Sequence, residues 1–296
     1  MTTAADSPPG IDLVRVRRHL AAVLDSPPGG PLTASVIAGG RSNVTYRVSD
    51  GSSTWVIRRP PLGGVLATAH DVAREARVMS ALADTDVPVP HVLHLCEDSG
   101  VIGAPFVVMD YVDGVVLRTN EQMVAYRPEQ LRHASTLLVQ TLLALHAVDP
   151  EAVGLSRFGK PEGFLERNLR RWATQWRDSR TRDLPVVDRI VDTLAADVPQ
   201  PQRVSVVHGD YRLDNVMFAP DLSQVAAVVD WELSTIGDPL ADVGLLLTYV
   251  EVADKVLGTS AAEGLLGSPG TLAAYAEGTD LDLSRIDWYT AFGVFK

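Results

Sequence analysis

The sequence predicts an α+β protein with a small antiparallel β lobe over residues 1–112 and a larger, mainly helical lobe over 113–296. Three observations predict this class. Short alternating segments rich in β-branched residues fill the first part of the chain. Long stretches with helical spacing dominate after Asp113-Gly114. A polar loop over His208 to Asn215 separates two short apolar strands within the helical part.

The spacing of apolar residues and the positions of turn-forming residues predict the elements of the first lobe. Apolar residues at helical spacing predict a helix over 11–24, which the Pro/Gly stretch at 26–31 ends. Period-two alternation between turn-forming residues predicts strands at 34–38, 43–48, 54–58, 92–95 and 106–111, with a helix over 69–82 inserted between the third and the fourth.

The same patterns predict the elements of the second lobe. Apolar residues at helical spacing predict helices over 131–147, 164–177 and 186–196 and a mostly helical chain from 240 onward. Short apolar runs predict strands at 204–207, 216–218 and 225–229. We detect no internal repeat.

Composition and charge exclude several classes of protein. Hydrophobic residues make up 46% and charged residues 21%, which is ordinary for a globular protein and excludes disordered, collagen and coiled-coil chains. Lys+Arg is 26 against Asp+Glu 37, giving a net charge of -11, the opposite of what a phosphate-neutralising nucleic-acid binder needs. The longest apolar stretches, such as 244–250, are far shorter than the roughly 20 residues of a membrane span. We therefore expect no nucleic-acid partner and no membrane insertion.

The single cysteine and the two chain ends carry further expectations. Cys96 cannot form an internal disulfide and supplies no CxxC pair for zinc, so we expect a half-buried apolar role for it. The N-terminus lacks a basic region followed by an apolar one, which favours a cytoplasmic location. The chain stops in an apolar, aromatic run, whereas chain ends are usually polar. We expect either that the natural protein continues past Lys296 or that a partner covers this end; the oligomeric state is left open.

Two polar motifs carry the predicted chemistry. In HGDYRLDN, Asp210 precedes Asn215 by five residues, and Asp230 ends a buried strand twenty positions after Asp210 (230 minus 210). Their oxygens are the hard ligands that Mg²⁺ prefers. The spacing matches the kinase catalytic loop, in which the first Asp accepts the proton of the substrate hydroxyl while the Asn and the second Asp hold Mg²⁺. The alternative is a plain polar loop, because Asp and Asn also favour turns.

The longer segments HGDYRLDNVMF and VVDWELSTIGDPLADVG resemble the aminoglycoside phosphotransferase family, relatives of choline kinase with a protein-kinase-like fold. The similarity runs from about Ser35 to about Val250. The stretches 39–46, 56–61 and 88–90 resemble the branch of that family whose domain is fused to, or encoded beside, acyl-CoA dehydrogenases. The resemblance implies a two-lobed kinase-like fold that binds ATP and Mg²⁺ in the cleft between the lobes.

The resemblance also implies a phosphate-binding loop at Gly39 and Gly40. Without side chains in the way, their backbone N–H groups can approach phosphate oxygens, and Ser42 and Asn43 can add side-chain donors. An ordinary hairpin turn is the alternative.

Arg58 lies at the end of the third strand, where kinases carry the lysine that binds the α- and β-phosphates. The first 159 residues contain no lysine, and an arginine stays charged and binds phosphate bidentately. Glu75, on the following helix, is the expected ionic partner that orients Arg58; an exposed helix glutamate is the alternative. Arg59 is next in the strand and should point to the other face, toward solvent.

Residues 106–112 resemble the hinge of the family. The resemblance implies that the main chain near Asp110 and Val112 reads the adenine and that Met109 flanks it, although a plain core strand fits the pattern as well.

Three further residues are expected to support the catalytic loop. In the kinase layout, His208 braces the loop through hydrogen bonds. Asp238 suits a helix cap before Pro239, and Asp242 follows in the first turn of that helix.

The function implied by the resemblance is ATP- and Mg²⁺-dependent phosphorylation of a hydroxyl group on a small molecule. The acyl-CoA dehydrogenase branch favours a hydroxy acid or hydroxyacyl thioester as acceptor and a functional link to such a dehydrogenase. An aminoglycoside is the first alternative, and a pseudokinase without turnover is the second, favoured only by Arg58 in place of lysine. The choice between ATP and GTP is left open.

Overall fold

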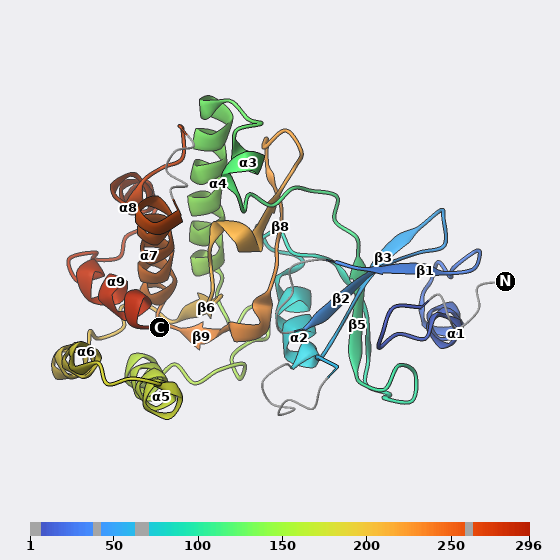
Figure 1. The fold of residues 1–296 in the computed structure, drawn as a ribbon, viewed down its shortest axis with the longest axis horizontal. Helices are drawn as coiled ribbons and strands as arrows, with labels where there is room; N and C mark the ends of the chain where they lie inside the picture. The colour runs from blue at the N-terminus through green and yellow to red at the C-terminus, as the bar shows by residue number, and fades with distance from the viewer. Residues whose placement is uncertain (1–6, 38–42, 63–70, 258–262) are drawn as a thin grey trace. The chain divides into compact units, whose positions relative to one another are not determined.

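The computed structural model describes residues 7–37, 43–62, 71–257 and 263–296 (Figure 1). The chain forms two compact units. The first comprises Met1–Ala83 and Val89–Asp113, and the second comprises Asp84–Pro88 and Gly114–Lys296. The five residues Asp84–Pro88 thus belong to the second unit, although both of their chain neighbours belong to the first.

The first unit contains an antiparallel sheet in the order β1-β2-β3-β5-β4. Its strands are β1 (Thr33–Val36), β2 (Val44–Ser49), β3 (Thr54–Arg59), β4 (Val92–Cys96) and β5 (Phe106–Asp110). All five predicted strands are therefore present, with ends within two residues of the expected positions. β4 forms one edge of the sheet.

Two helices accompany this sheet, α1 (Leu13–Val23) and α2 (Val72–Leu82) (Figure 1). Each begins at an aspartate cap: Asp12 accepts hydrogen bonds from the first turn of α1, and Asp71 accepts one from the first turn of α2. The apolar stripe of α1 packs with alternate sheet residues that include Ile57, and α2 packs on β4 and β5.

Alternation along β3 separates the two faces of the sheet. Ile57 belongs to the core beneath α1, so Arg58 faces the other side and Arg59 returns to the α1 side. The expectation that Arg59 faces solvent is wrong. Its side chain is only 7% exposed and donates to the carbonyls of Gly10 (2.6 Å) and Ile102 (2.9 Å), because the segment before α1 covers this face.

The second unit is mainly helical. Its helices are α3 (Asn120–Met123), α4 (Pro128–Ala147), α5 (Phe164–Ser179), α6 (Pro185–Ala196), α7 (Leu240–Leu257), α8 (Ser268–Glu277) and α9 (Ile286–Phe295). α4 begins three residues before the predicted start because a proline fits the first turn of a helix. α7 packs against α8 and α9, and α4 packs against α8 and β6. Among the helices of the described residues, none is both long and apolar enough to span a bilayer.

Two small antiparallel ribbons position the polar motifs in the second unit. β6 (Ser205–Val207) pairs with β9 (Thr235–Gly237), and β7 (Val216–Phe218) pairs with β8 (Val225–Val228). The loop 208–215 connects β6 to β7, and the segment 229–234 connects β8 to β9. Because the same two ribbons flank both connections, the two motifs lie next to each other in the fold.

Candidate active site

Asp210 lies in the loop after β6, where both of its carboxylate oxygens accept hydrogen bonds. The phenol of Tyr249 on α7 donates to Oδ1 at 2.9 Å, and the amide nitrogen of Asn215 donates to Oδ2 at 3.0 Å. The same amide nitrogen donates to the backbone carbonyl of Asp210 at 2.8 Å. Arg212 places its Nε 3.7 Å from Oδ2 and its guanidinium over the ring of Tyr249. The carboxylate is thus held in one orientation while keeping further lone pairs for a substrate hydroxyl.

Asn215 connects the loop to the second acidic motif. The backbone N–H of Val229 donates to the carbonyl of Asn215 at 2.9 Å, so Asp230 follows a residue that is directly bonded to the loop. Asp230 adopts a left-handed conformation with φ 69° and ψ 55°, which few residues other than glycine adopt. Among the described residues, no hydrogen bond reaches Oδ1 of Asn215, since its contacts with Asp210 use the amide nitrogen.

His208 connects both motifs from the buried side. Its Nε2 donates to the carbonyl of Val229 at 3.0 Å, and its Nδ1 accepts the N–H of Asp210 at 3.2 Å. Complete burial lowers the pKa of His208, against the opposing charges of Asp242, Asp210 and Asp230. One ring nitrogen donates and the other accepts, so these bonds require the neutral ring. His208 therefore braces the loop, and the lone pair of its Nδ1 is occupied by the N–H of Asp210.

Asp242, in the first turn of α7, holds the start of the loop. Its two oxygens accept the backbone N–H groups of His208 (2.7 Å) and Gly209 (2.8 Å). Burial alone would raise the pKa of Asp242, but His146, whose Nε2 lies 3.5 Å from Oδ2, and the N–H of Gly209 hold it below its ordinary value. His146 in turn bonds through Nδ1 to the hydroxyl of Tyr275 at 2.8 Å.

Asp238 has a separate structural position. One oxygen accepts the N–H of Leu240 at 3.0 Å, as expected of a residue that caps α7, and the other accepts the hydroxyl of Tyr289 at 2.6 Å. Burial raises the pKa of Asp238, which these two donors oppose.

Gly209 is required by the backbone at this point of the loop. Its φ is +84°, and a Cβ built there would lie 2.5 Å from the carbonyl oxygen of Leu233. Any side chain would therefore displace the loop from the 229–234 segment. This close approach is a second reason why the two motifs keep their mutual position.

Arg212, Tyr249 and His146 are among the supports of the loop that were not predicted from the sequence. Arg212 lies within the motif itself, two residues after Asp210, so its contact with that carboxylate could have been predicted from the sequence. Tyr249 and His146 lie on helices, 39 residues after Asp210 and 96 residues before Asp242, where no local pattern distinguishes them from core residues.

In the first unit, Arg58 and Glu75 lie in contact. Nε of Arg58 is 2.9 Å from Oε2 of Glu75, whose side chain is 2% exposed. The amide nitrogen of Asn43 donates to Oε1 of Glu75 at 2.6 Å, and within the part of the chain that the structure describes, Oδ1 of Asn43 is buried without a hydrogen-bond partner. The guanidinium also contacts Thr45 on β2. Glu75 is therefore a buried anchor and not an exposed helix residue.

The remaining predicted residues of the first unit are partly described. Gly39, Gly40 and Ser42 lie outside the described residues. Met109 is buried in β5, whereas Asp110 at its end is exposed. The backbone N–H of Asp110 donates to the carbonyl of His91 at 3.0 Å, so it is not free to read an adenine. In the part of the chain that is described, no such backbone bond involves Val112.

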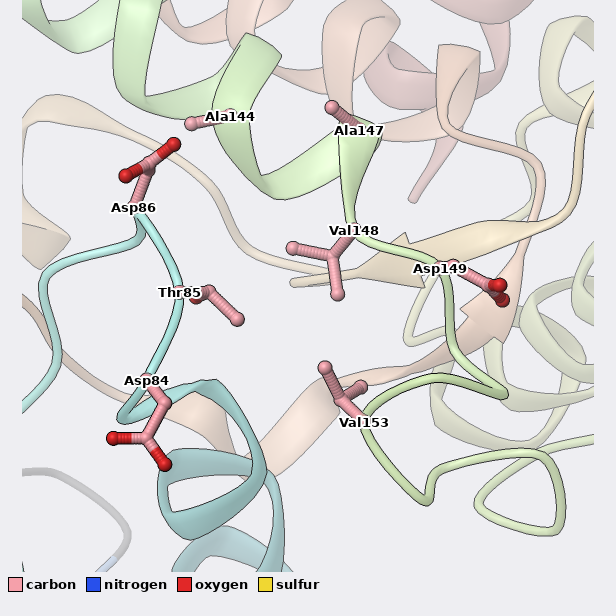
Figure 2. Close-up of a pocket in the computed structure, with 8 residues that line it drawn as sticks. All are labelled: Asp84, Thr85, Asp86, Ala144, Ala147, Val148, Asp149 and Val153. Atoms are coloured by element: carbon pink, nitrogen blue, oxygen red, sulfur yellow. The ribbon is translucent and has the colours of Figure 1, made fainter.

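A hollow of about 310 Å³ in the second unit contains none of the predicted site residues. It is lined by Asp84, Thr85, Asp86, Ala144, Ala147, Val148, Asp149 and Val153. Figure 2 shows Thr85, Val148 and Val153 toward its middle and the three carboxylates around its rim, directed away from one another. The carboxylates do not converge, so the hollow is not a cation site.

Comparison with known proteins supports the family resemblance. Residues 33–281 match the model of the phosphotransferase enzyme family. Acyl-CoA dehydrogenase family member 10 of Mus musculus is 39% identical over 228 residues, which are 77% of this chain and 21% of the mouse protein. Among the curated relatives it matches, the chain spans 21% to 36% of their length. The predicted resemblance to the members associated with acyl-CoA dehydrogenases is thereby confirmed.

Solved structures confirm the fold class. A Ralstonia eutropha protein described as a candidate aminoglycoside phosphotransferase superposes with a TM-score of 0.82 and 34% identity, over 96% of this chain and 85% of that one. An aminoglycoside phosphotransferase mutant solved with AMP-PNP and hygromycin B has a TM-score of 0.64 and 15% identity, over 95% and 88%. The predicted α+β, protein-kinase-like fold is confirmed, and the chain belongs to the phosphotransferase enzyme family.

Proposed function

We propose that the chain is an ATP- and Mg²⁺-dependent phosphotransferase whose acceptor is a hydroxyl group on a small molecule. The observation that carries this proposal is the hydrogen-bonded connection from Asp210 through Asn215 to Val229, which precedes Asp230. It joins one candidate base and two candidate metal ligands in a single unit. Membership of a phosphotransferase family supports the reaction type.

Asp210 is the proposed catalytic base. Tyr249 and Asn215 fix the two oxygens of its carboxylate, so the remaining lone pairs can accept the proton of a substrate hydroxyl without a change of rotamer. His208 is not the base in this proposal, because its acceptor nitrogen is bonded to the N–H of Asp210.

Asn215 and Asp230 are the proposed magnesium ligands. The amide nitrogen of Asn215 is directed to Asp210, which leaves its carbonyl oxygen as the atom available for a cation. An amide oxygen and a carboxylate suit Mg²⁺, which prefers hard oxygen ligands and completes its shell with phosphate and water. The bound ion would neutralise negative charge on the transferring phosphoryl group.

The first unit is the proposed nucleotide-binding lobe, and the second is the proposed lobe for catalysis and acceptor binding. Arg58, oriented by Glu75, is placed to bind ATP phosphates in the role that lysine has in most kinases. Oδ1 of Asn43, in the same cluster, is a buried polar atom that the described residues leave unsatisfied. Gly39, Gly40 and Ser42 complete the proposed phosphate site, and Val112 is the proposed main-chain contact for adenine.

A hydroxy acid or hydroxyacyl thioester is the acceptor that we propose first. Several relatives bear the names of acyl-CoA dehydrogenase family members, which supports an acceptor and a partner from the same chemistry. An aminoglycoside is the second candidate, favoured by the description of the Ralstonia eutropha protein. A pseudokinase is disfavoured because Asp210, Asn215 and Asp230 are all present.

The proposal is tested by incubating the protein with ATP, Mg²⁺ and a panel of hydroxyacyl thioesters, hydroxy acids and aminoglycosides, followed by phosphorus NMR. We expect a new phosphomonoester signal that needs Mg²⁺. Asp210→Ala should reduce turnover by about a hundredfold or more while ATP binding stays largely intact. The matched control is Asp192→Asn, an exposed aspartate on α6. Full activity in Asp210→Ala would disprove its role as base, and Mg²⁺-dependent ATP binding with no ATP consumed on any acceptor would favour the pseudokinase.

A further inference from the structure

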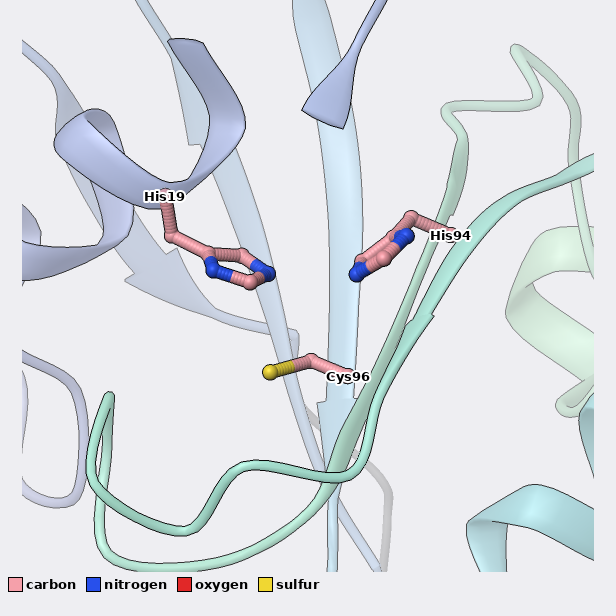
Figure 3. Close-up of side chains that lie close together, drawn as sticks. All are labelled: His19, His94 and Cys96. Atoms are coloured by element: carbon pink, nitrogen blue, oxygen red, sulfur yellow. The ribbon is translucent and has the colours of Figure 1, made fainter. Parts of the chain in front are cut away.

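Three metal-ligating side chains converge in the first unit: His19, His94 and Cys96. One donor atom from each, an imidazole nitrogen from either histidine and the cysteine sulfur, lies within 4.8 Å of the other two. Figure 3 shows the two imidazole rings directed toward each other, with the sulfur of Cys96 below the gap between them. The cluster takes no part in the proposed phosphoryl transfer.

The fold explains why these residues meet. His94 and Cys96 are two positions apart on β4, so their side chains leave the same face of the sheet. That face is covered by α1, which carries His19 between the buried residues Val16 and Leu20. α1 precedes residue 33, where the family match begins, so the cluster joins a segment outside the match to a strand inside it.

The donors of the cluster are poorly used by the protein itself. Among the described residues, Nε2 of His19 is buried without a hydrogen-bond partner, although buried polar atoms are normally satisfied. The thiol of Cys96 has only a long contact of 3.7 Å to the carbonyl of Asp98. The rings of His19 and His94 are 5.1 Å apart between centroids and tilted by 53°, so they are not stacked. An unsatisfied nitrogen that faces a second imidazole and a thiol is the arrangement expected of a set of metal ligands.

We propose that His19, His94 and Cys96 bind one Zn²⁺ ion, with a water molecule as the fourth ligand. Imidazole nitrogens and thiolate sulfurs are the ligands that zinc takes, and three protein ligands with a water in the fourth position is a known zinc arrangement. Tetrahedral bonds of about 2.0–2.3 Å to nitrogen and sulfur place the donor atoms roughly 3.4–3.6 Å apart. Because no two donor atoms are more than 4.8 Å apart, each separation needs to close by at most about 1.4 Å, which rotation of the two partly exposed imidazoles can supply.

The local electrostatics are compatible with a cation at this point. Burial and the neighbouring His19 lower the pKa of His94, which keeps its ring in the neutral form that binds metals. Burial, aided by the charge of Asp98, raises the pKa of the Cys96 thiol despite an opposing backbone hydrogen bond, which disfavours the thiolate, so the bond to the ion must itself supply the free energy of ionisation. The negative charge of Asp98 favours a dication there. On binding, the thiol proton passes to solvent and the sulfur ligates as thiolate.

Zinc at this site would attach α1 to the edge strand β4. Two of the ligands belong to the strand and one to the helix, so the ion would replace a contact between side chains by bonds across two elements. The expected consequence is a more stable first unit when the metal is bound, since a ligand that binds only the folded state raises the unfolding temperature.

The test uses the full chain without a histidine tag, stripped of metal and titrated with Co²⁺ as an optical probe for the zinc site. We expect one equivalent to bind with a tetrahedral cobalt spectrum and a thiolate-to-cobalt band, which only Cys96 can supply because it is the single cysteine. Zn²⁺ should displace the Co²⁺, raise the unfolding temperature and protect Cys96 from thiol reagents.

Variants separate this site from adventitious binding. His19→Ala and His94→Ala should weaken Co²⁺ binding by at least about tenfold, and Cys96→Ser should abolish the thiolate band. The exposed histidines give the controls: His91→Ala and His133→Ala should bind as the parent does. If Cys96→Ser fails to fold because the residue is buried, His19→Ala still tests the proposal, since His19 is partly exposed. Unchanged binding by His19→Ala, or no thiolate band in the parent chain, would overturn the proposal.

Discussion

Replacing Asp242 with asparagine would test how firmly the catalytic loop is anchored to α7. Both oxygens of the buried carboxylate accept backbone N–H groups, from His208 at 2.7 Å and from Gly209 at 2.8 Å. Asparagine has the same shape but only one acceptor oxygen. One of the two backbone donors would therefore face an NH₂ group and lose its partner.

The magnitude follows from the two lost contributions. A hydrogen bond to a charged group contributes about 1.5–3 kcal/mol, and a buried donor left unsatisfied costs about 1–3 kcal/mol. These terms overlap, so we expect a destabilisation of about 3 kcal/mol at pH 7. For a unit of this size, that corresponds to an unfolding temperature lower by roughly 6–12 °C. Asp192→Asn on the exposed face of α6 is the control and should stay within about 0.5 kcal/mol of the parent.

The pH dependence gives the reasoning a second check. The pKa of Asp242 in the folded chain lies below its ordinary value of 3.8. A carboxyl with a depressed folded pKa contributes stability that is complete above the unfolded pKa and is lost as the pH falls through the folded pKa. The difference between the parent and Asp242→Asn should therefore be constant from pH 7 to 5 and shrink below about 3.8.

Urea unfolding followed by tryptophan fluorescence is the suitable assay, because four of the five tryptophans lie in the second unit. Turnover in the acceptor assay should fall as well, since the loop carries Asp210. A midpoint for Asp242→Asn equal to that of the parent at pH 7 would refute the anchoring role. A difference that grows on acidification would refute the assigned direction of the pKa.

Three further predictions concern the same machinery. Gly209→Ala should lower the free energy of unfolding in urea by about 1–3 kcal/mol more than Gly154→Ala does. Both glycines have positive φ, but only a Cβ at Gly209 would meet a neighbouring backbone, so equal losses of stability would contradict the clash. Tyr249→Phe should lower kcat about tenfold and leave the KM for ATP unchanged, because it removes a donor from Asp210. Burial, together with Asp210, raises the pKa of Tyr249 to about 12, so this difference should stay constant from about pH 6 to 10, and a pH-dependent ratio would refute it. Arg58→Ala should raise the KM for ATP and lower the free energy of unfolding by about 3 kcal/mol, because it removes the charged partner of a buried carboxylate, whereas Arg58→Lys should do less of both; identical behaviour would count against the ion pair.

Local patterns predicted most of the fold. Alternation located all five strands of the first unit, and the cap expected at Asp238 is present because its side chain bonds within one helical turn. The elements that were missed are short: β9 has three residues and α3 has four, too few to display a period. Their formation depends on partners elsewhere in the chain, such as β6 for β9.

The candidate site was predicted as far as its residues lie in one motif. The roles suggested for Asp210, Asn215 and Asp230 came from spacing and resemblance, and they stay predictions. The supports from distant segments could not be read, since a hydrogen bond between residues 34 or 39 positions apart leaves no local pattern. Arg59 shows the same limit, because alternation gave its face of the sheet but not the segment that covers that face. The convergence of His19 with Cys96 is likewise visible only in the fold.

The contacts around Asp210 indicate that the motif acts as one hydrogen-bonded unit and not as separate ligands. The side-chain amide nitrogen of Asn215 donates to Asp210, and its backbone carbonyl accepts the N–H of Val229. His208 forms hydrogen bonds with the same two residues, Asp210 and Val229. The left-handed backbone of Asp230 costs roughly 1–2 kcal/mol, a cost that the surrounding bonds must offset. Removing any member therefore releases the others, so the effects of single replacements on catalysis should be far from additive. Loss of Asn215 should therefore disturb Asp210 as much as the proposed metal site.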